Sequence, residues 1–387
     1  MQITQEIKRV AKDVLYGPRI YAIRMRQQLS ARSAFEIVDG ACRYAMERYL
    51  GPGFCFTACS KIPDLYSTAY AISLLGLCRR LDWLDARQRR NLVEYFAAHQ
   101  AADGLYRAEN LNTPQAEVGQ GWGYMHLLPH ILIALDYLNA TPTMPFGYVN
   151  RIFQSTDPED WLDAIFSEDY LEASNFFMNI QVALQYERDT EKDDKMAALS
   201  GRLNQHVLKE ILPRYIGNPD QMGVFERSKK AKTIYHLLPS LCYDDLLPQK
   251  LAEGVTRLTL ATQNRVGSYG VCTMSDACED IDSVYNLAVL LQQAPSPGIE
   301  RSLEKARLYM PVNQNSDGGF VFRRFTSFCY GGAQVLSSAR NQSNMFATWF
   351  RVLAYAFADR ATKHQINWNF SRVPGYQWHS DVRGANQ

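Results

Sequence analysis

The sequence predicts an all-α protein folded as an (α/α)6 toroid, a double-walled barrel of six outer and inner helix pairs. Similar helix starts recur along the chain at intervals of roughly 55 residues. Amphipathic segments alternate with segments that are apolar on nearly all sides, and a helix that is apolar all round is a buried one. The equivalent points of the inner helices are Tyr66, His126, Phe176, His236, Asp282 and Ala347.

The helix pairs can be placed in order because Gly and Pro residues interrupt the periodic segments. We expect an N-terminal arm over residues 1–33, the toroid over 34–360, and a C-terminal tail over 361–387 that packs on the barrel. The segment 64–75 aligns without a gap with 280–291. The predicted pairs, outer helix first, are 34–49 with the helix from Pro63, 82–99 with the helix from His126, 146–166 with 171–186, 195–212 with 231–243, 246–262 with the helix from Ser275, and 299–310 with 343–358.

Three outer helices end in the same kind of turn, in which Gln is followed by Gly and then by an aromatic residue. These turns lie at 99–106, 263–270 and 313–320. Gly with an aromatic residue behind it is common at the C-terminal end of a helix. Three such turns in register indicate a repeated architecture.

Composition narrows the classes of partner. The chain has 41 Lys and Arg against 40 Asp and Glu, a net charge of +1, which argues against nucleic acid and against a polybasic membrane tether. No run reaches the roughly 18 apolar residues of a membrane span, and the N-terminus lacks the apolar core of a signal peptide. We therefore expect a cytoplasmic protein with at most peripheral membrane contact, and leave the oligomeric state open.

Eight cysteines are scattered without the paired spacing of a zinc site. We expect neither a metal nor a cofactor, and interpret the cysteines as thiols of the core.

Four carboxylates lie close together at the start of one inner helix. Asp276 and Glu279 have the spacing of a capping box, which explains them locally. Asp280 and Asp282 have no such explanation, so they are candidates for chemistry.

Histidines and aromatic residues cluster at the other inner-helix starts. Two of these starts share the tetrapeptide His-Leu-Leu-Pro. The residues either pack in the core or line a central cavity, and an aromatic cavity would suit a hydrocarbon or a carbocation. The candidate cavity residues are Tyr66, Trp122, His126, Phe176, Tyr285, Phe346 and Trp349.

The order of the Gln turn 263–270 and the acidic helix start 280–284 resembles the class II terpene cyclases, the squalene-hopene cyclase family, and more distantly the protein prenyltransferase β-subunits. In the cyclases a Q-x-x-D-G-G-W repeat precedes a catalytic D-x-D-D-T-A motif. The middle Asp, the proton donor of that family, corresponds to Asp282, and Ser283 stands where the family has its last Asp.

The resemblance implies proton-initiated cyclisation of a linear isoprenoid or meroterpenoid in an aromatic cavity. Asp282 would donate the proton to an alkene, with Asp280 or His236 orienting it. If the acid lies elsewhere, Glu117 and Glu109 are the alternatives. The implied partner is a small apolar substrate.

Two other interpretations stay open. One is a carbohydrate-active α/α barrel, a lyase, epimerase or hydrolase, with acid-base roles for His126, His236 and Tyr66, and with Asp282 or Glu117 as their partner. Arg323 and Arg324 at the mouth of a polar cavity would favour it. The other is a non-catalytic toroid that binds a lipid or a protein partner. The polarity around Asp282 distinguishes the first of these from the cyclase.

Overall fold

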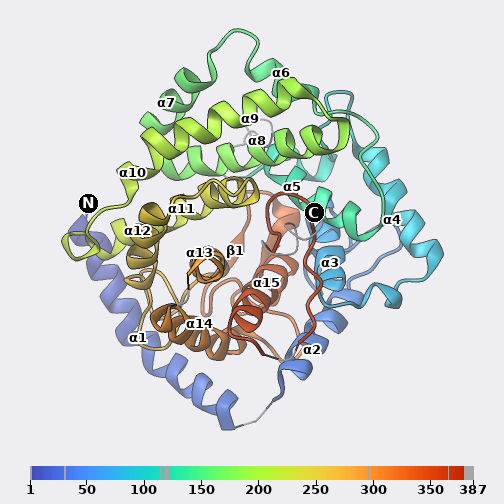
Figure 1. Ribbon diagram of the computed structural model, residues 1–387. Coiled ribbons are helices and arrows are strands. Elements are labelled where there is room, and N and C mark those ends of the chain that lie inside the picture. Colours follow the sequence, from blue (N-terminus) through green and yellow to red (C-terminus); the bar gives the residue numbers. More distant parts are fainter. Residues whose placement is uncertain are drawn as a thin grey trace.

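The computed structural model is a closed ring of helices, which confirms the predicted α/α toroid (Figure 1). The structure describes residues 2–29, 32–113, 116, 122–294, 296–364 and 366–378, and within these ranges six inner helices surround the centre. Each inner helix contacts the next one along the chain, and the last contacts the first. They are α3 (Leu65–Leu77), α5 (Tyr124–Tyr137), α8 (Tyr170–Glu191), α11 (Val224–Tyr243), α13 (Ala277–Gln293) and α15 (Met345–Ala361).

The outer wall consists of amphipathic helices whose apolar sides face the inner ring. They are α2 (Ala34–Met46), α4 (Ala86–His99), α7 (Pro158–Glu168), α9 (Asp194–His206), α12 (Gln249–Leu260) and α14 (Pro297–Tyr309). Short 3-10 turns lie at Leu81–Trp83 (η1), Glu109–Leu111 (η2), Pro219–Gln221 (η4), Met310–Asn313 (η5) and Gln334–Leu336 (η6).

Several predicted helix boundaries differ from the structure, and two of these differences have a clear cause. The outer segment 146–166 is divided into α6 (Gly147–Ile152) and α7, because Asp157 and Pro158 start a new helix. The inner helix α11 begins at Val224 instead of 231, since its first turns are charged and extend beyond the apolar core. In addition, α9 passes through a π-helical turn (η3, Val207–Ile211) into α10 (Leu212–Tyr215).

The repeated Gln turns join neighbouring pairs of helices. The side-chain nitrogens of Gln100, Gln263 and Gln314 each donate one hydrogen bond to a Gly carbonyl of the same turn and a second to a carbonyl of the next outer segment. For Gln314 the second acceptor is Ile37 of α2, at 2.8 Å. Gly318 in this turn has φ of +83°, a conformation that favours glycine. The Gln314 turn therefore helps to close the ring.

The helices α3, α13 and α15 begin in the same register. Their N-cap residues are Asp64, Asp276 and Asn344. Four residues after each cap, a side chain accepts a hydrogen bond from the backbone N–H of the preceding turn aromatic. These acceptors are Thr68, Asp280 and Thr348, at 3.0, 3.1 and 3.0 Å. The alignment of 64–75 with 280–291 is therefore wrong by four residues, because the equivalent of Asp64 is Asp276.

A loop between α14 and α15 covers the N-terminal ends of the inner helices. Within it, β1 (Phe328–Cys329) pairs antiparallel with β2 (Ser337–Ser338). The ring centroids of Phe328 and Tyr330 lie 5.3 and 4.8 Å from that of Phe346 on α15. The loop thus places aromatic side chains over the centre of the barrel.

The chain after α15 crosses the opposite end of the ring. The backbone N–H of Asn369 donates to the carbonyl of Leu77 at the end of α3, at 2.9 Å. Further on, the Tyr376 ring stacks on His130 of α5 at 5.6 Å between centroids. Trp378 packs on Phe357. Aromatic side chains therefore reach the barrel core from both ends.

The N-terminal residues form one long helix, α1 (Gln2–Leu29), which continues through Pro18 and runs along the outside of the barrel (Figure 1). Its buried contact is Ile20, which joins a small cluster with Val266, Met274, Tyr309 and Val312. Asp13 of α1 also accepts a hydrogen bond from the backbone N–H of Thr273, at 2.8 Å.

Candidate functional site

Charged side chains gather where α13 begins, beside α11 and the loop that follows η5. One guanidinium nitrogen of Arg323 lies 2.6 Å from Asp276 and 3.1 Å from Glu279. The ammonium nitrogen of Lys232, on α11, lies 3.9 Å from Glu279. The helix starts here because Asp276 and Glu279 form the predicted capping box. We call Asp276, Glu279, Arg323 and Lys232 the charged cluster.

The charged cluster holds Asp276 in the ionised form. Burial alone would raise the pKa of Asp276, but Lys232 and Arg323 lower it below its ordinary value. Burial likewise acts to lower the pKa of Lys232, and the neighbouring carboxylates raise it instead. The oxygens of Asp276 and Glu279 accept hydrogen bonds from each other's backbone N–H groups and from Arg323. Both carboxylates are therefore already bound.

Asp282 lies deeper in the barrel, and its pKa is shifted in the opposite direction to that of Asp276. Its side chain is buried, and among the described residues no hydrogen bond reaches its carboxyl group. Burial raises the pKa of Asp282 well above its ordinary value; Lys232 opposes this effect, and Asp276 and Glu279 add to it. The protonated form of Asp282 is therefore favoured near the ionised Asp276, and such a divergence of pKa values is typical of acid-base sites.

The helix register explains why Asp282 faces the centre. It stands six residues after its N-cap, as Tyr70 does on α3 and Phe350 on α15. The Tyr70 and Phe350 rings lie 5.5 Å apart across neighbouring inner helices. Asp282 thus places a carboxyl group where the sister helices place aromatic rings.

His236 is held in one tautomer. Its Nδ1 lies 3.1 Å from the Ser174 hydroxyl, and that hydroxyl donates its only proton to the carbonyl of Leu171 at 2.7 Å. Nδ1 must therefore carry the proton and donate to Ser174, which leaves Nε2 with a free lone pair. Burial, followed by His126 and Lys232, lowers the pKa of His236 to about 3. The imidazole is neutral, and Lys232 lies near both His236 and Asp282.

His126 lies among hydroxyl groups of the aromatic wall. Its Nδ1 is 3.1 Å from the Tyr66 hydroxyl and 3.0 Å from that of Tyr330. Tyr66 also donates to the carbonyl of Gly123 at 2.8 Å, and its ring is stacked with that of Trp122. Burial lowers the pKa of His126 to about 3. The effect of His126 on the pKa of His236 indicates that the two histidines face a common region.

The remaining predicted cavity residues are distributed over two layers. Phe346 contacts Tyr330 over the centre, and Tyr285 lies deeper, 5.2 Å from the Phe357 ring. Trp349 is buried on α15. Phe176 points outward, since its ring meets Trp161 of the outer helix α7 at 5.4 Å. The structure therefore gives Phe176 a packing role between the two walls.

Asp280 is a structural residue. It is fully buried, forms an ion pair with Arg351, and accepts hydrogen bonds from the Ser275 hydroxyl at 2.7 Å and from the Tyr269 N–H. The prediction that it orients a proton donor is wrong because its oxygens are already bound. Arg324 is also turned away from the cluster, toward Asn315 and the carbonyl of Val312.

Of the two alternative acids, Glu109 lies among the described residues and does not join the site. Glu109 is exposed on the 3-10 turn η2. Glu117 lies outside the described residues.

Two site residues were not singled out from the sequence. Lys232 lies four residues before His236, so helical spacing could have placed both on one face of α11. Tyr330 comes from an irregular loop, and no periodicity in the sequence leads to it.

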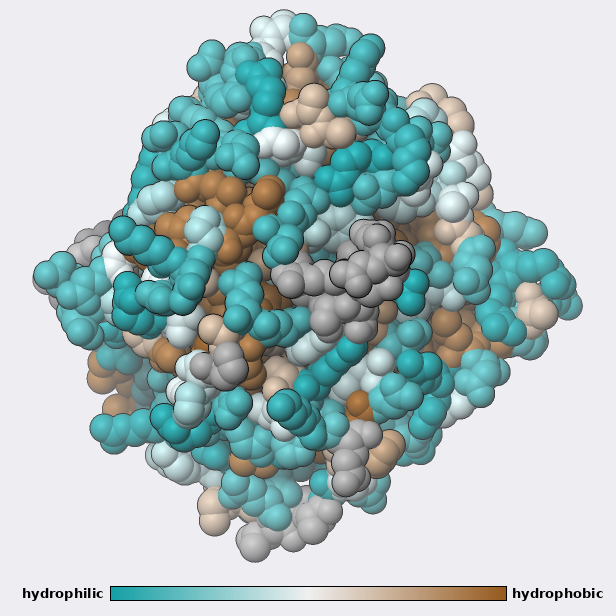
Figure 2. All heavy atoms as spheres, in the orientation of Figure 1, coloured by the Kyte–Doolittle hydropathy of each residue, from teal (hydrophilic) through white to brown (hydrophobic). Residues whose placement is uncertain are grey.

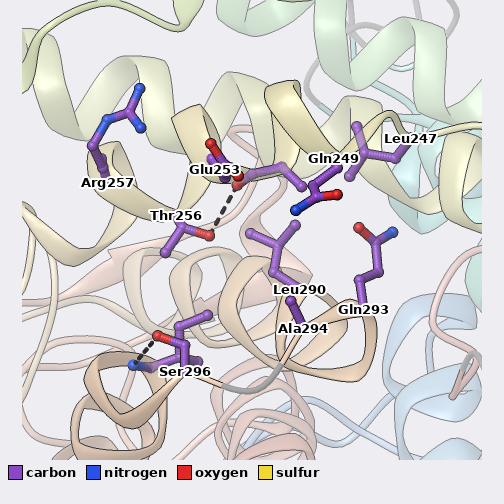
Figure 3. A pocket seen from close by; sticks show the side chains of 11 residues that line it. Leu247, Gln249, Glu253, Thr256, Arg257, Leu290, Gln293, Ala294 and Ser296 are labelled. Atoms are coloured by element: carbon purple, nitrogen blue, oxygen red, sulfur yellow. Dashed lines mark hydrogen bonds between the residues drawn. The ribbon is translucent and has the colours of Figure 1, made fainter.

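A pocket of 560 Å³ lies elsewhere, between α12, the end of α13 and the start of α14 (Figure 3). Its wall includes Arg257 and Glu253 of α12 and Leu290 of α13. Figure 2 shows apolar surface in the region that Figure 1 assigns to α12 and α13. Since α13 rises about 1.5 Å per residue, its two ends are about 25 Å apart. The pocket is therefore separate from the charged cluster.

The described residues contain neither a metal-ligand cluster nor a membrane span. No group of three or more His, Cys, Asp and Glu residues within them is arranged to hold a metal ion. In the same part of the chain, no helix is both long and apolar enough to cross a membrane.

The chain was compared with known proteins. No protein-family model and no curated protein match it. Among solved structures it is similar to a UGL mutant with dGlcA-Glc-Rha-Glc, with a TM-score of 0.48 and 11% identity over 87% of this chain and 98% of that chain. It is also similar to a mutant unsaturated glucuronyl hydrolase from Streptococcus agalactiae (0.46, 10%, covering 86% and 91%) and to D-mannose isomerase (0.43, 12%, covering 83% and 99%).

These neighbours correct the resemblance drawn from the sequence. They are carbohydrate-active α/α-barrel enzymes, so the assignment to the class II terpene cyclases is wrong, together with isoprenoid cyclisation and an apolar substrate. The structure supplies a physical reason. The Gln turns that suggested the cyclases are links between repeats, and the region around Asp282 is charged.

Proposed function

We propose that this chain is a carbohydrate-active enzyme that isomerises or epimerises a sugar by proton transfer, with Asp282 as the acid and His236 as the base. Two observations carry the proposal: Asp282 is a buried carboxyl group whose pKa is raised, and His236 is an imidazole whose Nε2 lone pair is free, both near Lys232. His236 would remove the proton from the carbon next to the sugar carbonyl. Asp282 would donate its proton to the carbonyl oxygen, which gives an enediol. Return of the proton from His236 to the former carbonyl carbon, while Asp282 takes the proton of the neighbouring hydroxyl group, would give the isomer.

The surroundings of this pair suit a sugar. The ammonium group of Lys232 can stabilise the charge that develops on the substrate oxygen. Tyr330, Trp122 and Tyr66 present ring faces and hydroxyl groups beside His126. Polar groups that fix orientation together with aromatic walls are typical of small-molecule sites.

Proton transfer is favoured over hydrolysis by the state of the carboxylates. A glycoside hydrolase pairs an acid with a second, free carboxylate that acts as base or nucleophile. The carboxyl groups of Asp276 and Glu279 are bound to Arg323 and to backbone N–H groups. The acid-base group that keeps a free lone pair is the imidazole of His236.

Deuterium exchange tests the proposal across many sugars at once. The full chain is incubated in deuterated water with a panel of aldoses, ketoses and amino sugars, and proton NMR follows the carbon next to the carbonyl. Deuterium should enter a substrate that is also isomerised. Asp282→Asn and His236→Gln should each slow this reaction about 10²- to 10⁴-fold without lowering the Tm.

The matched control is Asp160→Asn, which removes an exposed carboxylate from α7 and should leave the rate unchanged. A parallel assay uses aryl glycosides of the same sugars. Release of the aryl group without deuterium exchange would replace the proposal by hydrolysis. Unchanged exchange in both site variants would remove Asp282 and His236 from the reaction.

A further inference from the structure

The helix α1 leaves an apolar face uncovered. It packs on the barrel through Tyr16, Ile20 and Ile23, and the opposite face points to solvent. Val14 on that face is 72% exposed. The large apolar side chains exposed along α1 are Ile7, Val10, Val14, Leu15, Tyr21 and Met25.

The spacing of these side chains produces one continuous stripe. Ile7, Val14 and Tyr21 recur every seventh residue, and Val10 and Met25 fall one turn from them. Residues three, four and seven apart lie on the same side of a helix. In Figure 1, α1 runs along the outer edge of the molecule, and Figure 2 shows hydrophobic surface at that edge. A flat partner can therefore approach the stripe.

Basic side chains line one border of the stripe. Lys8, Lys12, Arg19 and Arg26 are exposed, and helical spacing places them on the same side. The acids of the helix are absent from this border: Glu6 and Asp13 each form an ion pair with Arg9. Among the described residues, no ion pair involves any of the four border bases. Although the net charge of the chain is close to zero, α1 therefore carries a locally basic edge.

We propose that α1 docks this protein on an anionic lipid surface, with the apolar stripe in the interface and the four border bases against lipid phosphates. Amphipathic helices with a basic border bind membranes in this way. The proposal is independent of the sugar chemistry assigned to Asp282 and His236.

Charge favours lipid over a second copy of the chain. Two α1 stripes packed antiparallel would bring basic border against basic border, which is repulsive. A parallel pair would bring the basic border against the other edge of the stripe, where the exposed carboxylate of Glu6 is already paired with Arg9. An anionic surface supplies the missing negative charge.

Vesicle flotation with the full chain tests the proposal. Vesicles of phosphatidylcholine mixed with phosphatidylserine should bind the protein at least about tenfold more tightly than phosphatidylcholine alone, and added salt should weaken this preference. The double variant Lys12→Gln with Arg19→Gln should weaken binding to the anionic vesicles about tenfold or more. Val14→Ser should weaken it several-fold through the apolar term, roughly as expected for a Val side chain.

Matched controls separate α1 from the rest of the surface. Arg89→Gln with Arg90→Gln on α4 makes the same change in net charge, and Ile62→Ser removes an exposed apolar side chain outside α1. Neither should alter binding, and circular dichroism should show all variants folded. Equal binding to both vesicle types, or no binding, would overturn the proposal. So would self-association of the free protein that strengthens when Lys12 and Arg19 are neutralised, since that result identifies a second copy as the partner.

Discussion

Replacing Arg351 by methionine tests how strongly one buried ion pair stabilises the barrel. Arg351 and Asp280 are both fully buried, and Arg351 also donates to the carbonyl oxygens of Ser275 and Phe322, each at 2.9 Å. Methionine fills much of the same volume without charge or donors. The Asp280 carboxylate would then be buried without compensation, so the free energy of unfolding should fall by about 3–5 kcal/mol.

Urea unfolding followed by circular dichroism measures this loss. Arg301→Met, an exposed change on α14, is the control and should stay within about 0.5 kcal/mol of the parent. Adding Asp280→Asn to Arg351→Met should restore part of the loss, because no unpaired charge remains. A loss below about 1 kcal/mol for Arg351→Met alone, with unfolding still cooperative, would refute the reasoning.

The pH dependence offers a second measurement on the same pair. Burial, against the effect of Arg351, raises the pKa of Asp280 from 3.8 to about 6. Because the folded state binds this proton more tightly, the stabilisation is complete below the unfolded pKa and is lost as the pH rises through the folded one. The expected loss is about 3 kcal/mol. Asp280→Asn should remove this part of the pH dependence of unfolding.

Three further variants test the turns and the site. Gln263→Ala removes two hydrogen bonds between repeats and should cost about 1–3 kcal/mol in urea unfolding. Gly318→Ala should lower the Tm, because a Cβ at its positive φ would meet a backbone oxygen of α2 at 2.2 Å, whereas Gly201→Ala, in an open helical position, should raise it. Ser174→Ala removes the acceptor that orients His236 and should lower the rate of deuterium exchange about tenfold with little change in Tm.

The sequence predicted the ring because its signals are local. Each signal depends on only a few consecutive residues: an apolar segment, an N-cap such as Asp64, or a Gln turn. Such signals recur along the chain. The predicted helix boundaries were wrong where tertiary packing determines them. The first turns of α11 are helical although their charged residues belong to no apolar period.

The site was harder to predict because the aspartates of one motif serve three purposes. Asp276, Asp280 and Asp282 follow one another at short intervals, yet one caps the helix, one anchors the Tyr269 turn and one faces the centre. The pairing of Asp280 with Arg351, 71 residues away, helps to distinguish the anchor from the acid. Contacts over such a distance leave no periodic trace in the sequence.

Closure of the ring has a consequence for folding during synthesis. An open array of repeats can fold pair by pair, since each unit contacts only its neighbours. Here α3 is buried on all sides, and one of its covers is α15, at the other end of the toroid. During synthesis, one apolar side of α3 therefore stays exposed to solvent until α15 has been synthesised and can pack against it. The nascent protein therefore presents an aggregation-prone edge for most of its synthesis, and we expect chaperones to recognise this edge before the ring is complete.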